Sequence, residues 1–275
     1  DEPKGKIICK RATTLHTEEC TQTDESLYCS REGYIASGSK GTSTITYGNL
    51  GTKGSLNSGD AFDCDVNGDG EYNPGTERFY YVSDYYNTST KKFESDTAVL
   101  IYFNNVNSGN PSTDSTYAYD SSGENWHGPR TLIAQLPTKN QWGNVSLKNV
   151  TRTIFNEISG NTTTGGALPS NFSYEGYAAR LLTVEEIRQA TRKSNIPTLE
   201  VGELNNAIYL MENTRFSSKN NGPWAWWLEN SSSNYSNVAQ NASGNTCNVN
   251  GNYVQDAGGN GVRPAIEVSK INIDY

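Results

Sequence analysis

Apolar residues occur in this sequence in short runs, and that pattern limits the elements that the chain can form. The longest run, Ala98 to Phe103, has the length of one buried strand. The segments between such runs are rich in Gly, Asn, Ser and Thr, which favour turns. With 34% hydrophobic residues and a mean hydropathy of −0.70, the core must be thin and must depend on the 17 Tyr, 7 Phe and 5 Trp. We therefore predict a β-rich α+β fold with few short helices and long loops.

Individual elements follow from local patterns. Aromatic and β-branched residues predict strands at 77–83 and 97–104. The strongest helix signal lies at 177–193, where Thr183 and Glu186 have the spacing of a capping box. We also expect a strand at 42–47, a strand at 131–136, a short helix at 137–142, helical turns at 152–158 and strands from 224 onward.

The charge and the hydropathy of the chain exclude two classes of partner. A formal net charge of −8 would repel the phosphates of nucleic acid. No apolar run approaches the length of about 20 residues that a membrane span needs, so we expect no membrane insertion.

The chain opens at Asp1-Glu2-Pro3, as a mature N-terminus would after cleavage of a signal peptide. We expect a secreted, extracellular protein associated with the cell surface.

The cysteines lie at positions 9, 20, 29, 64 and 247, and none has the spacing of a zinc site. In an exported protein, the four early cysteines are expected to form two disulfides that stabilise a segment poor in apolar residues. Four cysteines allow three pairings, of which we favour Cys20 with Cys29 and Cys9 with Cys64. Cys247 is then left over, as a buried thiol or as a partner in an intermolecular bond.

The segment 63–72 carries the most specific short motif. Read from Asp65, it is D-x-N-x-D-G, the beginning of an EF-hand-type or dockerin-type calcium loop. The side chains of Asp65, Asn67 and Asp69 can converge on one hard cation. Without a cation, the carboxylates of this short segment would repel one another. We predict a structural calcium site here, and the alternative is an Asx-rich turn without metal.

Three further residues complete the predicted calcium site. Glu71 would supply its backbone carbonyl. Thr76 occupies the position at which an EF-hand has a bidentate Glu, so Glu77 would take over that role if the loop bulges at Pro74-Gly75. Asp63 would serve as an outer or alternative ligand.

Several segments of the C-terminal half together resemble the formylglycine-generating-enzyme and C-type-lectin-like fold. ARLLTVEE at 179–186 is similar to the strand-to-helix signature of that family, R-L-P-T-x-x-E-W, and LPTKNQW at 136–142 is similar to a second version of it. WAWW at 224–227 and GVRPA at 261–265 follow in the same order as the tryptophan cluster and the closing strand of the family.

The resemblance covers about 130–275 and implies a C-type-lectin-like module at 131–275. Residues 1–130 would then be a disulfide- and calcium-stabilised, β-rich N-terminal elaboration, unless the two parts form one continuous domain. Arg263, in the closing strand, is expected to make a structural contact rather than to bind a ligand.

The resemblance does not extend to catalysis. The formylglycine-generating members use a pair of cysteines that holds copper, whereas Cys247 is the one cysteine in the matching half. Sugar-binding C-type lectins use E-P-N or Q-P-D triplets beside calcium, and these are missing from the sequence. No Ser/His/Asp arrangement and no phosphate loop is evident. We expect that the protein is not an enzyme.

The segment 220–260 is rich in Asn, Ser, Tyr and Gly, the residue types that recognition loops use. It also resembles the variable region, ending in V-R-P, of retroelement-diversified proteins that have this fold. We predict an extracellular recognition or adhesion protein that binds a glycan or a protein ligand, unless the segment is an exposed loop without a ligand. The predicted contact residues are Trp227, Asn230, Asn234, Tyr235 and Tyr253.

The alternative function is that of a structural subunit in a bacterial surface filament or layer. The unpaired Cys247, the missing membrane anchor and the Tyr-, Thr- and Asn-rich strands would suit self-association.

Overall fold

The computed structural model describes residues 5–22, 41–106, 116–154, 170–191, 207, 209–210, 225–232, 235–243 and 248–275. Within these residues the protein is β-rich and has two short α-helices, α1 (Arg130–Ile133) and α2 (Val184–Thr191). The predicted β-rich α+β class is therefore confirmed. No helix in the described part of the chain is both long enough and apolar enough to cross a membrane.

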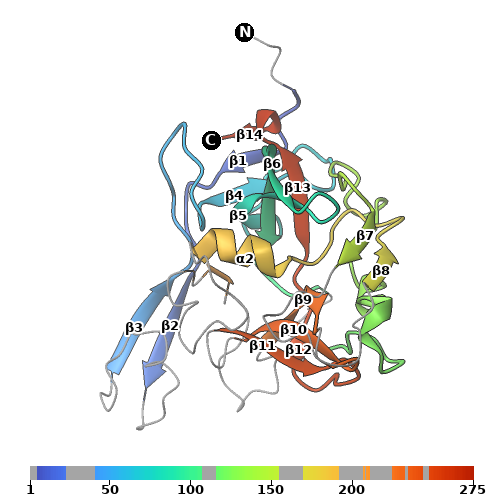
Figure 1. The fold of residues 1–275 in the computed structure, drawn as a ribbon. Coiled ribbons are helices and arrows are strands. Elements are labelled where there is room, and N and C mark those ends of the chain that lie inside the picture. The colour runs from blue at the N-terminus through green and yellow to red at the C-terminus, as the bar shows by residue number, and fades with distance from the viewer. Residues whose placement is uncertain are drawn as a thin grey trace.

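A six-stranded sheet forms the larger part of the molecule (Figure 1). Neighbouring strands of this sheet are antiparallel, except that the terminal strand β14 runs parallel to β1. In spatial order the strands are β13 (Ala265–Ser269), β6 (Lys92–Tyr102), β5 (Arg78–Asn87), β4 (Ala61–Cys64), β1 (Cys9–Arg11) and β14 (Ile273–Asp274).

A second sheet of four strands lies at the other end of the molecule, and two strand pairs stand apart from both sheets (Figure 1). The four-stranded sheet has the order β11 (Asn248–Tyr253), β10 (Val238–Ser243), β9 (Ala225–Ser231) and β12 (Asn260–Gly261). The pairs are β2 (Thr17–Gln22) with β3 (Gly41–Thr46), and β7 (Thr151–Ile154) with β8 (Ser170–Ser173). Two 3₁₀ turns, η2 (Asn125–His127) and η5 (Lys270–Asn272), complete the elements used below.

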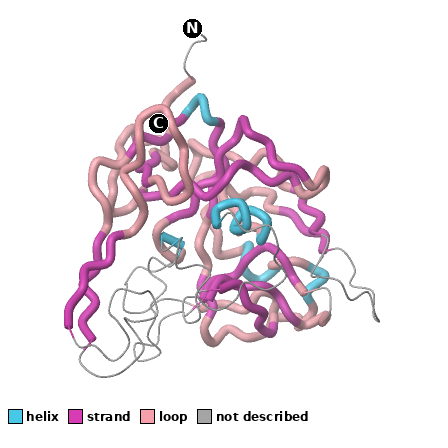
Figure 2. Tube along the Cα trace, turned by 60° about the vertical axis from the view of Figure 1, so that its left-hand side comes forward, coloured by secondary structure: helices cyan, strands magenta, loops and turns pink. Residues whose placement is uncertain are grey.

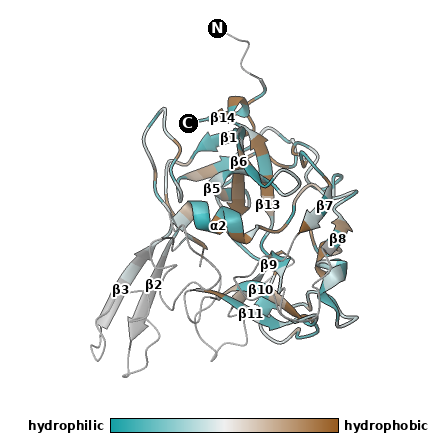
Figure 3. Cartoon of the chain, in the orientation of Figure 1, coloured by the Kyte–Doolittle hydropathy of each residue, from teal (hydrophilic) through white to brown (hydrophobic). Residues whose placement is uncertain are grey.

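The apolar runs lie in the central strands, as the sequence predicts. Ala98 to Ile101 in β6 are fully buried, and hydrophobic colour is concentrated along β6 and β13 (Figure 3). Trp226 and Trp227 are both fully buried and belong to different core clusters. Their side chains therefore point to opposite faces of β9, as alternation along a strand requires.

Helix α2 lies between the two sheets, close to β5 and β9 (Figures 1 and 2). Its predicted capping box is confirmed. The Glu186 backbone N–H donates to Thr183 Oγ1 at 3.2 Å, and the Thr183 backbone N–H donates to Glu186 Oε2 at 3.0 Å. The buried face of the helix, which includes Val184, Ile187 and Ala190, joins the main hydrophobic core.

Three local predictions between residues 130 and 158 are wrong. The segment predicted as a strand begins instead with α1, which follows Pro129 and buries Leu132 and Ile133. The predicted helix at 137–142 is a turn, in which the N–H groups of Gln141 and Trp142 both donate to Thr138 O. The segment predicted as helical turns begins with β7, which is paired with β8. In each case pairing or packing with distant residues outweighs the local pattern.

Two buried arginines connect the elements. Arg180 forms ion pairs with Glu186 of α2 and Glu267 of β13, each at 2.6 Å, and all three side chains are at most 1% exposed. Arg152 of β7 forms a bidentate ion pair with Glu229 of β9 at 2.8 Å. A buried charge is costly unless it is paired and hydrogen-bonded, so these contacts fix the relative positions of four elements.

Cys9 and Cys64 form the predicted disulfide, which joins β1 to β4. It closes a loop with a sequence separation of 55 residues, for which chain entropy predicts a stabilisation of about 4 kcal/mol. Disulfides are typical of proteins in oxidising compartments. Cys29 and Cys247 lie outside the described residues, and the predicted Cys20–Cys29 bond lies there with them.

The large sheet combines strands from both sides of residue 130. Strands β1, β4, β5 and β6 precede that residue, whereas β13 and β14 follow it. Arg263, just before β13, is buried and donates to the carbonyl oxygens of Tyr102, Tyr209 and Leu210. It makes the structural contact that the sequence predicts.

We predict that Glu186→Gln lowers the free energy of unfolding by about 3 to 5 kcal/mol, because it leaves part of a buried guanidinium charge unpaired. Urea denaturation measures this change. Glu175→Gln is the matched control, since Glu175 is 73% exposed and pairs with Lys139 at 3.6 Å; it should change stability by less than about 0.5 kcal/mol. Equal effects of the two substitutions would contradict the role of the buried pair.

The same residue predicts a pH dependence of stability. Burial alone would raise the pKa of Glu186, but the Arg180 charge and the hydrogen bonds to the carboxylate outweigh burial, so the pKa is lowered from its ordinary value of 4.5. Glu186 therefore stabilises the fold above pH 4.5, and this contribution is lost as the pH falls through the lowered pKa. Unfolding free energies measured across this acidic range should decline less steeply for Glu186→Gln than for the parent, and parallel curves would refute the assignment.

Candidate metal centre and the C-terminal surface

The loop 65–77 joins the antiparallel strands β4 and β5, so its two ends lie side by side. The Cys64 backbone N–H donates to Glu77 O at 2.9 Å, and the Asp65 backbone N–H donates to Ile8 O at 2.9 Å. The disulfide at Cys64 attaches this end of the loop to β1. The first and last residues of the predicted calcium motif are therefore held together by the sheet.

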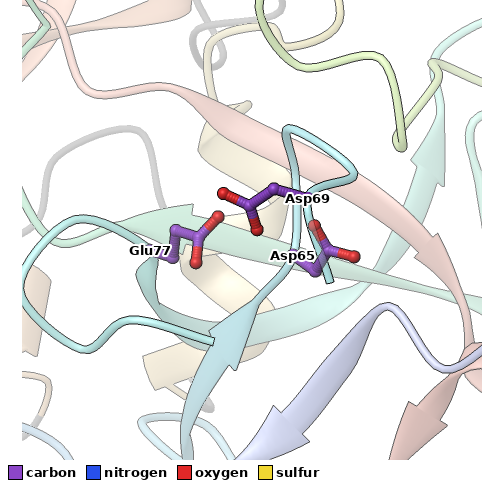
Figure 4. Close-up of side chains that lie close together, drawn as sticks. All are labelled: Asp65, Asp69 and Glu77. Atoms are coloured by element: carbon purple, nitrogen blue, oxygen red, sulfur yellow. The ribbon is translucent and has the colours of Figure 1, made fainter. Parts of the chain in front are cut away.

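Three carboxyl groups gather in this loop (Figure 4). One oxygen from each of Asp65, Asp69 and Glu77 lies within 4.8 Å of the other two. Asp65 and Glu77 are buried, while Asp69 is exposed. This set of oxygen atoms can hold a metal ion, with the exposed side open to water molecules as further ligands.

Hydrogen bonds inside the loop fix the carboxylates in place. Asp65 Oδ1 accepts from the Gly68 N–H at 2.8 Å, and Asp69 Oδ1 accepts from the Glu71 N–H at 2.8 Å. Gly68 has a φ of 84°, a conformation that favours glycine. Asn144 Nδ2 donates to both Asp65 O and Asp65 Oδ2, which connects the loop to a turn that lies 79 residues further along the chain.

Within the cluster, Glu77 has a buried carboxylate oxygen that no described residue satisfies. It is 4% exposed, and its Oε1 atom has no hydrogen-bond partner among the described residues. Burial raises the pKa of Glu77, the hydrogen bond from the Asn73 N–H lowers it, and the charges of Asp69 and Asp65 raise it further, so that the pKa is raised overall. A divalent cation would supply the missing partner for Oε1 and offset the repulsion between the carboxylates.

The other predicted ligands have different positions. Asp63, predicted as an outer or alternative ligand, is not part of the cluster of Asp65, Asp69 and Glu77. Its Oδ1 accepts from Arg78 Nε at 2.7 Å, in a largely buried ion pair with the residue opposite it on β5. Asn67 Nδ2 donates to Asp69 Oδ2, so Asn67 orients a carboxylate of the cluster. The Glu71 side chain is exposed and outside the cluster, which is compatible with the predicted role of its carbonyl. Glu77, predicted as the substitute for the missing Glu, does join the cluster.

Two of the predicted contact residues on the C-terminal surface are buried, which removes them from the candidates. Trp227 is fully buried, donates from Nε1 to Tyr117 O at 2.7 Å and packs edge-on against Tyr119. Asn230 is 7% exposed, and its Oδ1 accepts from the Val184 N–H at 2.9 Å at the start of α2. Their side chains hold the sheet and the helix together.

Two other predicted contact residues are exposed. Tyr235 is 65% and Tyr253 is 63% exposed. They lie at one end of the β10–β11 pair, because Val238 pairs with Tyr253 and its N–H donates to Tyr235 O. Asn234, the remaining candidate, lies outside the described residues.

The loop around η2 brings a third aromatic side chain to this end of the sheet. Asn125 Nδ2 donates to the carbonyl oxygens of Ser232, Tyr235 and Val238, and the Asn125 backbone N–H donates to Ser236 O. The next residue, Trp126, is 40% exposed and lies against His127, with ring centroids 3.6 Å apart and ring planes tilted by 43°. Trp126 is not among the contact residues predicted from the sequence, although a Trp inside a Gly- and Asn-containing turn is a recognisable signal.

Asp120, Ser122 and His127 form a cluster in this loop that has the composition of a catalytic triad. Ser122 Oγ and Asp120 Oδ2 both contact His127 Nδ1, and Ser122 Oγ also contacts Asp120 Oδ2. A triad needs the serine and the aspartate on different ring nitrogens of the histidine. The arrangement therefore fixes the loop and does not activate the serine.

The chain matches no protein-family model, no curated protein and no solved structure. The resemblance to the C-type-lectin-like fold stays a prediction from sequence.

We predict that Ca²⁺ raises the melting temperature of the parent protein and that excess chelator reverses this effect. A cation at a hundredfold excess over its dissociation constant stabilises a fold by about 2.7 kcal/mol. Glu77→Gln should abolish the shift. Without added cation this variant should melt no lower than the parent, because it lacks the repulsion in the cluster.

Glu71→Gln is the control, since it alters an exposed carboxylate of the same loop that lies outside the cluster. It should retain the full shift with Ca²⁺. Superimposable melting curves of the parent with Ca²⁺ and with chelator would remove the cation site.

Proposed function

We propose that this chain is an extracellular, calcium-stabilised recognition protein that binds a glycan or a protein ligand. The proposed contact surface, called the aromatic surface below, consists of Trp126, Tyr235 and Tyr253. The observation that carries the proposal is that three large aromatic side chains are 40% to 65% exposed at one end of a hydrogen-bonded sheet. Exposed aromatic residues on a rigid base provide contact area at a low cost in conformational entropy.

The base of the aromatic surface is rigid. The side chain of Asn125 connects three carbonyl oxygens of the segment that carries Tyr235. Within the same sheet, Asn241 Nδ2 of β10 donates to Asn260 Oδ1 of β12 at 2.6 Å, with both residues fully buried. A fixed backbone reduces the ordering that ligand binding would otherwise require.

Calcium is the cation that suits the loop best. The available donors are carboxylate and carbonyl oxygens, which hard cations prefer. The loop is irregular and partly open to water at Asp69, which matches the flexible coordination of Ca²⁺ better than the strict octahedron of Mg²⁺. We assign the ion a structural role, because the cluster lies on the large sheet beside the disulfide rather than on the aromatic surface.

A C-type-lectin-like core is part of the proposal. Arg180 and Glu186 of the signature-like segment form the central ion pair, and Arg263 of the closing-strand motif binds three carbonyl oxygens. These are scaffold roles, such as a shared fold would need. The missing cysteine pair and the geometry of the His127 cluster favour binding rather than catalysis.

We predict that Tyr235→Ala combined with Tyr253→Ala lowers ligand affinity at least tenfold, because large aromatic contacts dominate binding energies. The parent is first screened on arrays of immobilised glycans and of extracellular proteins, and the variant is then measured by surface plasmon resonance on the ligand found. Stability should change by less than about 1 kcal/mol, since both side chains are exposed.

Ile271→Ala is the matched control, because Ile271 is a 61% exposed apolar residue of η5, outside the aromatic surface. It should bind like the parent. Absence of binding on both arrays, or equal affinities of the parent and the tyrosine variant, would overturn the proposed function.

A further inference from the structure

A cleft of about 340 Å³ lies beside the turn that ends the loop 65–77, which is called the cation loop below because it carries the candidate metal cluster. This volume falls within the range of about 300 to 1,000 Å³ that is usual for small-molecule sites. None of the described residues that line the cleft has a charged side chain, so an uncharged ligand suits it best. The walls are formed by residues 75–76 and 102–106 together with Gln135, Pro137, Gln141 and Trp142.

Aromatic rings form one part of the wall and hold each other in place. Tyr102 contacts Trp142 and Phe103 edge-on, with ring centroids 5.4 Å and 4.8 Å apart. The Tyr102 hydroxyl donates to Thr76 O at 3.1 Å, which attaches the ring to the end of the cation loop. Trp142 packs against Phe79 of the core in the same way, at 5.5 Å. Such mutually packed rings present fixed apolar faces.

Two amide side chains provide polar groups with a defined orientation. The Asn104 Oδ1 atom accepts from the Asn105 N–H at 2.7 Å. The Gln141 Oε1 atom accepts from the Thr138 N–H at 2.9 Å and from the Thr138 hydroxyl at 3.1 Å. In both residues the amide oxygen is occupied by the protein, and the NH₂ group has no partner among the described residues. These two NH₂ groups of the cleft lining are therefore available to donate to acceptors of a ligand.

We propose that this cleft binds a neutral saccharide. The C–H face of a sugar ring packs on aromatic side chains, and its hydroxyl or acetamido oxygens accept hydrogen bonds from the NH₂ groups of Asn104 and Gln141. This combination of apolar faces with a few placed polar groups is what small-molecule sites use for affinity and orientation. The cleft shares no residue with the aromatic surface, so the inference goes beyond the proposed function and does not depend on it.

Two nearly isosteric substitutions test the inference. Asn104→Asp and Gln141→Glu keep the oxygen that accepts from the backbone but replace the NH₂ donor with an acceptor. Saturation-transfer NMR is recorded on the full chain with glucose, galactose, mannose and N-acetylglucosamine, and with glucuronic acid as the charged probe. The parent should bind at least one neutral sugar and should not prefer glucuronic acid. Each variant should bind that sugar at least tenfold more weakly.

Gln189→Glu is the matched control, because Gln189 Oε1 also accepts a backbone N–H, from Asp84 at 2.8 Å, and the residue lies outside the cleft. It should bind like the parent. Thermal melts show whether the variants are folded. If a variant melts early, the test is instead whether the sugar changes the NMR signals of the Trp142 ring in the parent.

No signal from any neutral sugar, a preference for glucuronic acid, or unchanged affinity in both cleft variants would overturn the inference. Sugar binding that is lost in the Tyr235/Tyr253 variant but kept in Asn104→Asp and Gln141→Glu would also overturn it, while leaving the proposed function intact. Loss in the cleft variants alone would support the cleft and leave the aromatic surface to be judged by its own ligands.

Discussion

The fold depends on one buried guanidinium. Arg180 lies fully inside the protein, bound to Glu186 at the start of α2 and to Glu267 in β13. Its backbone also pairs with Ala265 in both directions, at 2.9 Å and 2.7 Å. Since an unpaired charge in this place would cost several kcal/mol, the helix, the large sheet and the closing strand can be assembled in one relative arrangement. Glu186 serves twice, as the partner of Arg180 and as half of the capping box.

A second set of constraints acts at the cation loop. The disulfide at Cys64, the cross-strand hydrogen bond to Glu77 and the bonds from Asn144 hold both ends of the loop against the sheet. The turn at its end has two sides. Glu77 faces the carboxylate cluster, whereas its neighbour Thr76 carries the carbonyl that accepts from Tyr102 in the cleft wall. The same few residues thus line both the candidate cation cluster and the proposed saccharide cleft.

Local sequence signals were sufficient where a residue acts through its near neighbours. The capping box at Thr183, the strands around Ala98 and the convergence of Asp65 with Asp69 all depend on short-range spacing. Local signals do not reveal pairing with residues that are distant in the sequence. Asp63 of β4 forms an ion pair with Arg78 of the neighbouring strand β5, and residues 151–154 form a strand because β8 lies beside them. The Asn-rich segment misled for a related reason. Asn230 and Asn241 are buried bridges between elements rather than surface groups, and composition alone does not distinguish a bridging amide from an exposed one.

The pairing of β1 with β14 brings the first and the last described strands to the same end of the molecule. The first and the last described strands lie next to each other at one pole, and the sheet of β9, β10 and β11 lies at the opposite pole (Figure 1). A tether joined to either strand would therefore hold the protein by the same end. In both cases the sheet of β9, β10 and β11 would lie at the end away from the point of attachment, whichever of the two strands is tethered (Figure 1).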